Sequence, residues 1–244
     1  MAAHGAPGAL IGRVVLITGA TGAAGRATAA RFAADDASLG LVGTDEGRLA
    51  ALAEELGLPA ARVATAIGDL RDPAAARAAV ATIVDRLGPI DVVLHLVGGW
   101  AGGTPTTEED PGVVADMLAQ HLWTTFHIIQ ATVPAMTERG WGRVVAITAS
   151  VTATPAPNMA AYAIAKSAEE ALLRTVAREV GAKGVTVNLL AVRKIDAEHE
   201  RETAPAPRNA SWTTPEEIAA TLAMLCSDDG AAINGVRIPL DGRA

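Results

Sequence analysis

The sequence predicts an α/β protein built on a single, doubly wound parallel sheet with helices on both faces. Short apolar runs of strand length alternate with alanine-rich helical segments along most of the 244 residues. Half of the residues are hydrophobic and only 3% are aromatic, which favours small side chains packed closely between helices and a sheet. The length suits one large domain with a sizeable core, which we expect over residues 12–244.

Charge and cysteine content argue against several classes of function. A net charge of −7 and an isoelectric point near 5.2 argue against nucleic-acid or anionic-membrane binding. The single cysteine, Cys226, allows neither an intramolecular disulfide nor a Cys-rich zinc site, and we expect no metal. Residues 1–11 lack the basic start and apolar run of a signal peptide, so we expect a flexible arm. No apolar run reaches the roughly 18 residues of a membrane span, and we expect a soluble, cytoplasmic protein.

The first strand and helix enclose a glycine-rich turn. An apolar run at residues 13–17 is followed by the turn and then by a helical segment at residues 26–34. Glycines let the backbone approach a pyrophosphate, whose charge is favoured by a helix N-terminus. The spacing Gly19-x-x-Gly22-x-x-Gly25 also suits a plain strand–helix connection, but its place in the first such unit favours a dinucleotide site.

The end of the second strand, residues 39–42, bears on the choice of cofactor. An NAD-selecting site places an acid here to bond the ribose 2′-hydroxyl. That position is Gly43, and Asp45 lies two residues too late. We therefore expect NADP(H) to be favoured over NAD(H), with Thr44 near the 2′-phosphate.

Further ligand-binding residues follow the next strands. Asp69 and Leu70 follow the strand at 63–67, where an adenine ring would lie, although Asp69 also suits a turn. Asp72 before Pro73 predicts a helix start. The strand at 91–97 ends in a loop with four glycines and Trp100, which offers a flat face for stacking.

The second half of the chain adds three strands, further helical regions and an irregular segment. Residues 113–139 predict a long helix divided near Val133-Pro134, and a fifth strand at 143–148 follows. After the sixth strand, 185–192, helical and strand periodicity stops over about 193–213, which we expect to be a substrate lid rather than a solvated loop. Thr213 or Thr214 then caps a final helix that ends near Cys226, and residues 236–240 form the last strand.

Tyr162 and Lys166 lie four residues apart, which places both side chains on one face of a helix. An ammonium group favours the phenolate, so we expect Lys166 to lower the pKa of Tyr162 from about 10. Such a tyrosine can donate a proton to a carbonyl, or accept one from an alcohol, beside a hydride carrier. Taken alone, the pair also suits an ordinary exposed helix surface.

The order of these motifs resembles the short-chain dehydrogenase/reductase family over about residues 12 to 241. The likeness includes Val187-Asn188 and residues 234–242. It implies a Rossmann-type sheet of about seven strands, a nicotinamide cofactor, and a homodimer or homotetramer. Tyr162 would be the acid/base, and Lys166 would hold the ribose. The expected cofactor-binding residues are Gly19, Thr21, Gly22, Ala24, Gly25, Gly43, Thr44, Asp69, Leu70, Val97, Gly98, Gly99, Tyr162 and Lys166.

Three positions depart from the family pattern. The family serine falls on Ala149, and the neighbouring Ser150 either replaces it or no serine acts. A family asparagine is replaced by His121, and the Pro-Gly after the sixth strand by Val192-Arg193. The altered serine, the Gly-Gly-Trp-Ala-Gly-Gly loop and residues 211–213 are similar to dihydropteridine reductases.

We therefore expect an NAD(P)(H)-dependent oxidoreductase that moves hydride to or from a carbonyl, imine or quinonoid ring of a small molecule. Tyr162 would be the proton donor, assisted by Lys166 and by Ser150 or His121. Trp100, Ser150, Val192 and Arg193 would contact the substrate. The alternatives are a dinucleotide-sensing regulatory protein with little catalysis, and a 3-oxoacyl-thioester reductase that uses Ser150.

Overall fold

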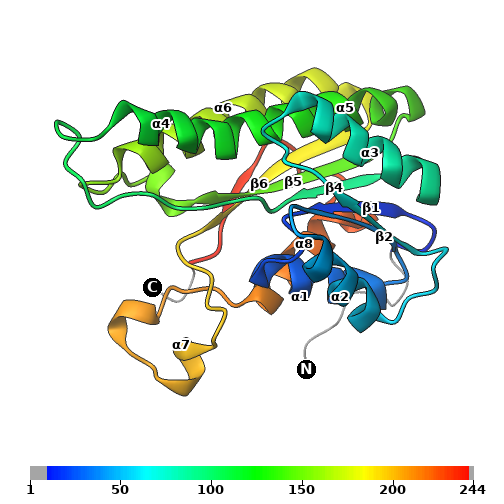
Figure 1. Ribbon diagram of the computed structural model, residues 1–244, viewed down its shortest axis with the longest axis horizontal. Helices are drawn as coiled ribbons and strands as arrows, with labels where there is room; N and C mark the ends of the chain where they lie inside the picture. Colours follow the sequence, from blue (N-terminus) through cyan, green and yellow to red (C-terminus); the bar gives the residue numbers. More distant parts are fainter. Residues whose placement is uncertain (1–9, 242–244) are drawn as a thin grey trace.

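A seven-stranded parallel sheet forms the centre of the computed structural model, which describes residues 10–241 (Figure 1). The strand order is β3-β2-β1-β4-β5-β6-β7, and every neighbouring pair is parallel. This confirms the predicted fold class. The strands are β1 Val14–Thr18, β2 Ser38–Gly43, β3 Val63–Ile67, β4 Val92–His95, β5 Gly142–Ala149, β6 Val185–Val192 and β7 Arg237–Pro239.

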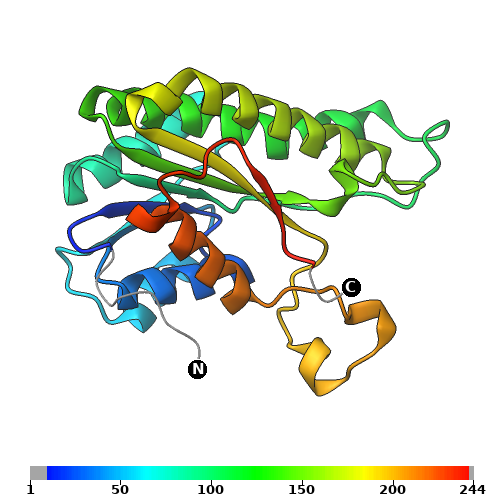
Figure 2. The same ribbon diagram turned by 180° about the vertical axis from the view of Figure 1, so that it is seen from behind.

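Helices cover both faces of the sheet, as seen from the front and from behind (Figures 1 and 2). One layer holds α3 Pro73–Leu87, α4 Pro111–Leu118, α5 Thr124–Arg139 and α6 Ala160–Val180. The other layer holds α1 Ala23–Ala34, α2 Glu46–Leu56 and α8 Pro215–Cys226. Each layer buries its own hydrophobic core against the sheet.

The alternation of side chains along each strand fills both cores. In β1, Val14 and Leu16 join the core under α3, α5 and α6, while Val15 and Ile17 join the core under α1, α2 and α8. All five residues of β1 are buried. A strand buried on both faces has a continuous apolar sequence, which explains why runs of valine, leucine and isoleucine predicted these strands.

Two predicted helix starts are confirmed by capping hydrogen bonds. The Asp72 carboxylate accepts a bond from the backbone N–H of Ala74, with Pro73 in the first turn of α3. Thr214, one of the two threonines expected as cap, forms a capping box with Glu217 at the start of α8.

The long helical region divides at a different place from the one predicted. Pro134 lies inside α5, and the interruption is a π-helical segment at Ala119–Trp123 between α4 and α5. A π turn leaves carbonyl groups without their usual partners. The hydroxyls of Thr124 and Thr125 donate to the carbonyls of Gln120 and His121 and so satisfy them.

The segment at 193–213 contains more structure than the sequence suggested. A short helix, α7 Glu200–Thr203, and a 3₁₀ turn, Pro207–Asn209, project from the sheet (Figure 1). The buried Asp196 carboxylate accepts the backbone N–H groups of Glu200 and Arg201, which orders the start of α7. We call residues 193–213 the lid segment. Most of the arm expected at 1–11 lies outside the described residues.

Among the helices of residues 10–241, none has the length and apolar character needed to cross a membrane.

Candidate active site at the carboxyl ends of the strands

The strand order reverses between β1 and β4, and the carboxyl ends of these strands border a cavity of about 420 Å³. Ligands of doubly wound sheets bind at this kind of reversal. The lining includes nine of the predicted cofactor residues, namely Gly19, Thr21, Gly22, Gly43, Thr44, Asp69, Leu70, Val97 and Gly98. The structure therefore brings together residues from the ends of four strands.

The backbone around the glycine turn leaves no space for a side chain at Gly19 or at Gly25. Gly19 has a φ of +68°, and a Cβ there would lie 2.7 Å from the carbonyl oxygen of Leu96. A Cβ on Gly25 would lie 2.4 Å from the carbonyl oxygen of Gly19. Gly22 begins α1 without a side-chain cap, so the first backbone N–H groups of the helix stay available. This cradle fits a pyrophosphate, as helix N-termini do in dinucleotide sites.

The residues of this cavity at the end of β2, Gly43 and Thr44, include no carboxylate. Asp45 caps α2 by accepting the backbone N–H of Arg48, and it also pairs with that guanidinium. Asp69 forms a bidentate pair with Arg71, and this contact lowers the pKa of Asp69. Gly43 and Thr44 thus present no negative charge to a ribose.

A second cavity, of about 790 Å³, surrounds Tyr162. It contains all four predicted substrate residues, Trp100, Ser150, Val192 and Arg193. Ser150 begins a 3₁₀ turn after β5, and both it and Ala149 line the cavity. The remaining lining residues are Ile147, Thr148, Val151, Thr154, Ala156, Met159, Lys194 and Ile195.

Lys166 is held by a buried carboxylate that the sequence analysis did not single out. Its Nζ lies 2.8 Å from Glu169 Oε2 and donates to the Ile147 carbonyl oxygen at 2.8 Å. Glu169 is fully buried and also accepts the Thr125 hydroxyl at 2.9 Å. The spacing of three residues on one helix was the available signal for this pair.

The expected lowering of the Tyr162 pKa is not what the structure shows. Burial and, to a lesser extent, the negative charge of Glu169 together raise the pKa of Tyr162 to about 12. Glu169 balances the ammonium of Lys166 at 2.8 Å, so the lysine charge does not act alone on the phenol. The prediction failed because the sequence pair was considered without its buried neighbour.

His121 lies in the π-helical segment with its ring edge against Tyr162, at 5.5 Å between ring centroids. Its Nε2 lies 3.1 Å from the Gly99 carbonyl oxygen, a contact in which the ring nitrogen donates. Burial, followed by the charge of Lys166, lowers the pKa of His121 to about 3. The ring is therefore neutral near pH 7, and its contact with Gly99 connects the π-helical segment to the glycine loop.

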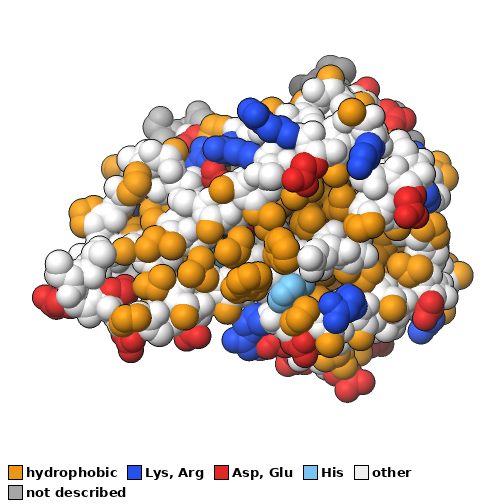
Figure 3. Space-filling model, turned by 90° about the horizontal axis from the view of Figure 1, so that it is seen from above, with side chains coloured by type: hydrophobic (Ala, Val, Ile, Leu, Met, Phe, Trp, Pro, Cys, Tyr) orange, Lys and Arg blue, Asp and Glu red, His pale blue; other side chains and the backbone are white. Residues whose placement is uncertain are grey.

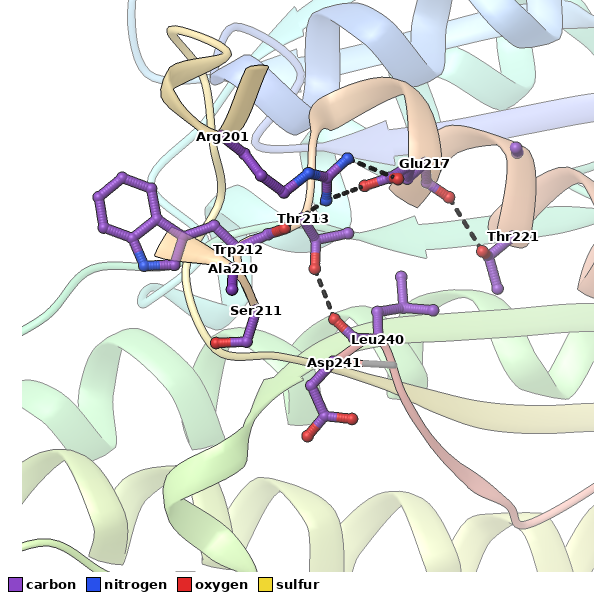
Figure 4. A pocket seen from close by; sticks show the side chains of 10 residues that line it. Arg201, Ala210, Ser211, Trp212, Thr213, Glu217, Thr221, Leu240 and Asp241 are labelled. Atoms are coloured by element: carbon purple, nitrogen blue, oxygen red, sulfur yellow. Dashed lines mark hydrogen bonds and ion pairs between the residues drawn. The ribbon is translucent and has the colours of Figure 1, made fainter. Parts of the chain in front are cut away.

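The far side of the lid segment is anchored to α8 and to the end of β7 (Figure 4). Arg201 makes a bidentate ion pair with Glu217 and donates to the Trp212 carbonyl oxygen. Thr213 donates to the Leu240 carbonyl oxygen at 2.6 Å. These contacts border a further cavity of about 410 Å³ and fix the position of residues 211–213.

The chain matches the family model described as short chain dehydrogenase over residues 13–207. It is a member of the short-chain dehydrogenase family. This dehydrogenase is 33% identical, over 92% of its length and 91% of the relative, to "(2S)-[(R)-hydroxy(phenyl)methyl]succinyl-CoA dehydrogenase subunit BbsC" of Thauera aromatica. It is 32% identical, over 99% of its length and 98% of the relative, to an uncharacterised NAD-dependent oxidoreductase of Mycobacterium tuberculosis.

Levodione reductase of Leifsonia aquatica is 34% identical over 94% of this dehydrogenase and 93% of the relative. A crystal structure of levodione reductase superposes with a TM-score of 0.87 over 96% of this chain and 97% of that chain, at 30% identity. The family and the named relatives establish this dehydrogenase as an NAD(P)-dependent oxidoreductase.

Proposed function

We propose that this dehydrogenase transfers hydride between a nicotinamide cofactor and a carbonyl, imine or quinonoid ring, with Tyr162 as the acid/base. The observation that supports this most is the cavity that Tyr162, Ser150 and Trp100 share, in a protein whose glycine turn borders a second cavity. The nicotinamide supplies or accepts the hydride when the cofactor is bound.

The protonation state of Tyr162 favours reduction. With a pKa raised to about 12, the phenol is protonated near neutral pH and can donate to a carbonyl oxygen that gains negative charge. Ser150 lines the same cavity and offers a hydroxyl donor to the same oxygen. Lys166, which lies four residues from Tyr162 on the same helix, is held between Glu169 and the Ile147 carbonyl oxygen.

The residues around the first cavity fit a dinucleotide. Gly19, Gly22 and Gly25 would hold the pyrophosphate, and Asp69 and Leu70 would border the adenine. The absence of a carboxylate at Gly43 and Thr44 supports acceptance of a 2′-phosphate, and hence NADP(H), although relatives include NAD-dependent enzymes. Fluorescence titration with NADH and NADPH measures this preference, and tighter binding of NADH would contradict it.

Substitution of Tyr162 by phenylalanine tests the acid. We expect Tyr162→Phe to bind the preferred cofactor as the wild type does and to lose about 100- to 10,000-fold in kcat, because general acids contribute this much. Turnover is measured with a cyclic diketone, an aryl ketone and a quinonoid dihydropterin. Wild-type rates in Tyr162→Phe would exclude the assignment, and cofactor binding with no turnover by the wild type would favour the regulatory alternative.

A thioester reductase is the second candidate. The relative from Thauera aromatica is named for a succinyl-CoA derivative, which is a thioester. Ser150 lies in the Tyr162 cavity, as this function requires. Retention of full activity on a 3-oxoacyl thioester by Ser150→Ala would count against a role for the serine.

The outer face of α4, α5 and α6 supports self-association into a homodimer or homotetramer. Trp123 and Ile164 are 48% and 47% exposed, and Figure 3 shows hydrophobic side chains gathered over this face. Sedimentation velocity at micromolar concentration measures the assembly, and a monomer there would contradict this proposal.

A further inference from the structure

Two cations stand at the rim of the Tyr162 cavity without an acidic partner. Arg193 and Lys194 follow β6 directly, both are exposed, and both line the cavity. Within residues 10–241, neither forms an ion pair. None of the residues that line the cavity is aspartate or glutamate, so the cavity has a net positive rim.

The lid segment holds these two cations in fixed positions. Arg193 Nη1 donates to the buried Ser211 Oγ at 2.7 Å. The Lys194 ammonium lies over the Trp212 ring, 3.4 Å from its centroid. Ser211 and Trp212 are in turn fixed by the contacts of Arg201 and Thr213 with α8 and with the end of β7 (Figure 4).

Three carboxylates in and next to the lid segment are already engaged, and no other acid of the segment lines the cavity. Asp196 accepts two backbone N–H groups, Glu200 pairs with Arg208, and Glu217 pairs with Arg201. A guanidinium whose bond is to a neutral hydroxyl keeps donors free for a planar carboxylate. The positions of Arg193 and Lys194 therefore match a negatively charged ligand.

We propose that the substrate carries a carboxylate and that Arg193 and Lys194 bind it while its carbonyl faces Tyr162. This inference rests on the proposed function, because it takes the Tyr162 cavity as the substrate site. The same cations could instead meet a phosphate of the cofactor, and the experiment below separates these two sources. Residues 192–193, where the family has Pro-Gly, would then be a specificity determinant of this chain.

The first test compares an aryl ketone acid with its neutral ester, 4-oxo-4-phenylbutanoate and its methyl ester. We expect the wild type to prefer the acid, and Arg193→Gln to lose about 10- to 100-fold in kcat/KM on the acid alone. Arg193→Lys should restore part of the loss, because it keeps the charge. Arg208→Gln, which removes a charge from the same segment outside the cavity, should leave both substrates unchanged.

The second test needs no turnover. Calorimetry measures binding of phenylsuccinate and of its dimethyl ester to the wild type and to Arg193→Gln, each saturated with cofactor. Tighter binding of the acid by the wild type, reduced about tenfold or more in Arg193→Gln, supports the carboxylate site. If the binding measurements give this result but the enzyme reduces no ketone, the proposed function is wrong and the carboxylate site at Arg193 is still supported.

Three outcomes would overturn the proposal. One is equal binding of acid and ester by the wild type. Another is a loss of kcat/KM or of affinity in Arg193→Gln that is equal for the acid and for the ester. The third is weaker binding of NADH or NADPH by Arg193→Gln with an unchanged acid-to-ester ratio, which would assign the cations to the cofactor phosphate.

Discussion

The ammonium of Lys166 is balanced inside the protein by Glu169, three residues further along α6. Both side chains are almost wholly buried, with exposed side-chain fractions of 4% and 1%. Thr125 on α5 and the Ile147 carbonyl on β5 complete the contacts of this pair. A buried pair of this kind costs desolvation, and removal of one partner leaves the other charge unbalanced.

Removal of the Glu169 charge should make Tyr162 more acidic. Because the charge of Glu169 contributes to the raised pKa of Tyr162, although less than burial does, we expect Glu169→Gln to lower this pKa from about 12 by up to about 1. Tyr162 is the only tyrosine in the chain, so phenolate absorbance in a rapid pH jump reports this residue alone.

Glu170→Gln is the matched control for this change. Glu170 is also buried on α6, but it accepts from Thr148 and Thr152 and pairs with Arg237. Substitution of Glu170 should leave the pH midpoint of the Tyr162 titration unchanged. An unchanged midpoint in Glu169→Gln would show that the Lys166–Glu169 pair does not control the phenol.

At the scale of elements, the approach of β1 to α1 decides the shape of the cofactor cavity. The turn between them brings the start of α1 so close to the carbonyls of Gly19 and Ala20 that only glycine fits at position 25. This contact sets the direction in which the backbone N–H groups of the helix point. Gly25 is therefore needed for the close approach of α1 to the end of β1, whereas the packing at Gly22 is less tight.

Alanine at position 25 should displace α1. A Cβ there would lie 2.4 Å from the Gly19 carbonyl oxygen, so we expect Gly25→Ala to lose about 1–3 kcal/mol of unfolding free energy and to weaken cofactor binding. Urea unfolding and nicotinamide fluorescence measure the two effects. Gly22→Ala is the control, since its Cβ would lie 3.4 Å from the same oxygen, and its stability should stay near that of the wild type.

At the scale of the whole molecule, a buried polar chain links the centre of the sheet to the helices above it. His95 on β4 bonds Thr18 on β1 at 2.8 Å and Thr124 at the start of α5 at 3.2 Å. Burial lowers the pKa of His95 to about 3. The ring is neutral in the folded protein, whereas an unfolded histidine titrates near 6.5.

The folded protein should lose stability in mild acid through His95. The folded-state pKa lies below the unfolded value, so this contribution is complete above about pH 6.5 and declines as the pH falls toward 3. Between pH 7 and pH 5 we expect a loss of about 2 kcal/mol from His95, measured by urea unfolding. His95→Gln should reduce this pH dependence by that amount.

Thr124→Val is the control that distinguishes the titration of His95 from the loss of its hydrogen bond. It removes a hydrogen bond of His95 but no titrating group, so its cost should be similar at both pH values. Equal pH dependence in His95→Gln and in the wild type would contradict a neutral, buried His95.

The sequence by itself determined the sheet and the segments that line the two cavities at its edge. Strands buried on both faces need continuous apolar runs, and helix starts need capping residues such as Asp72 and Thr214, so both features appear as local patterns. The end of the sixth strand at Val192 and the end of α8 at Cys226 followed in the same way. The break in the long helix was misplaced, because Pro134 is tolerated inside α5 and the π segment has no strong local signal.

Only the tertiary structure decided the electrostatics of the candidate site. The pKa of Tyr162 depends on burial and on Glu169, and the availability of Arg193 depends on which lid carboxylates are already paired. Glu169 lies on α6 with Tyr162, but the groups that hold the Lys166–Glu169 pair come from α5 and β5, and the acid that pairs with Arg201 comes from α8. A charge acts through the distance and the medium between groups, and neither quantity is fixed by spacing along the chain.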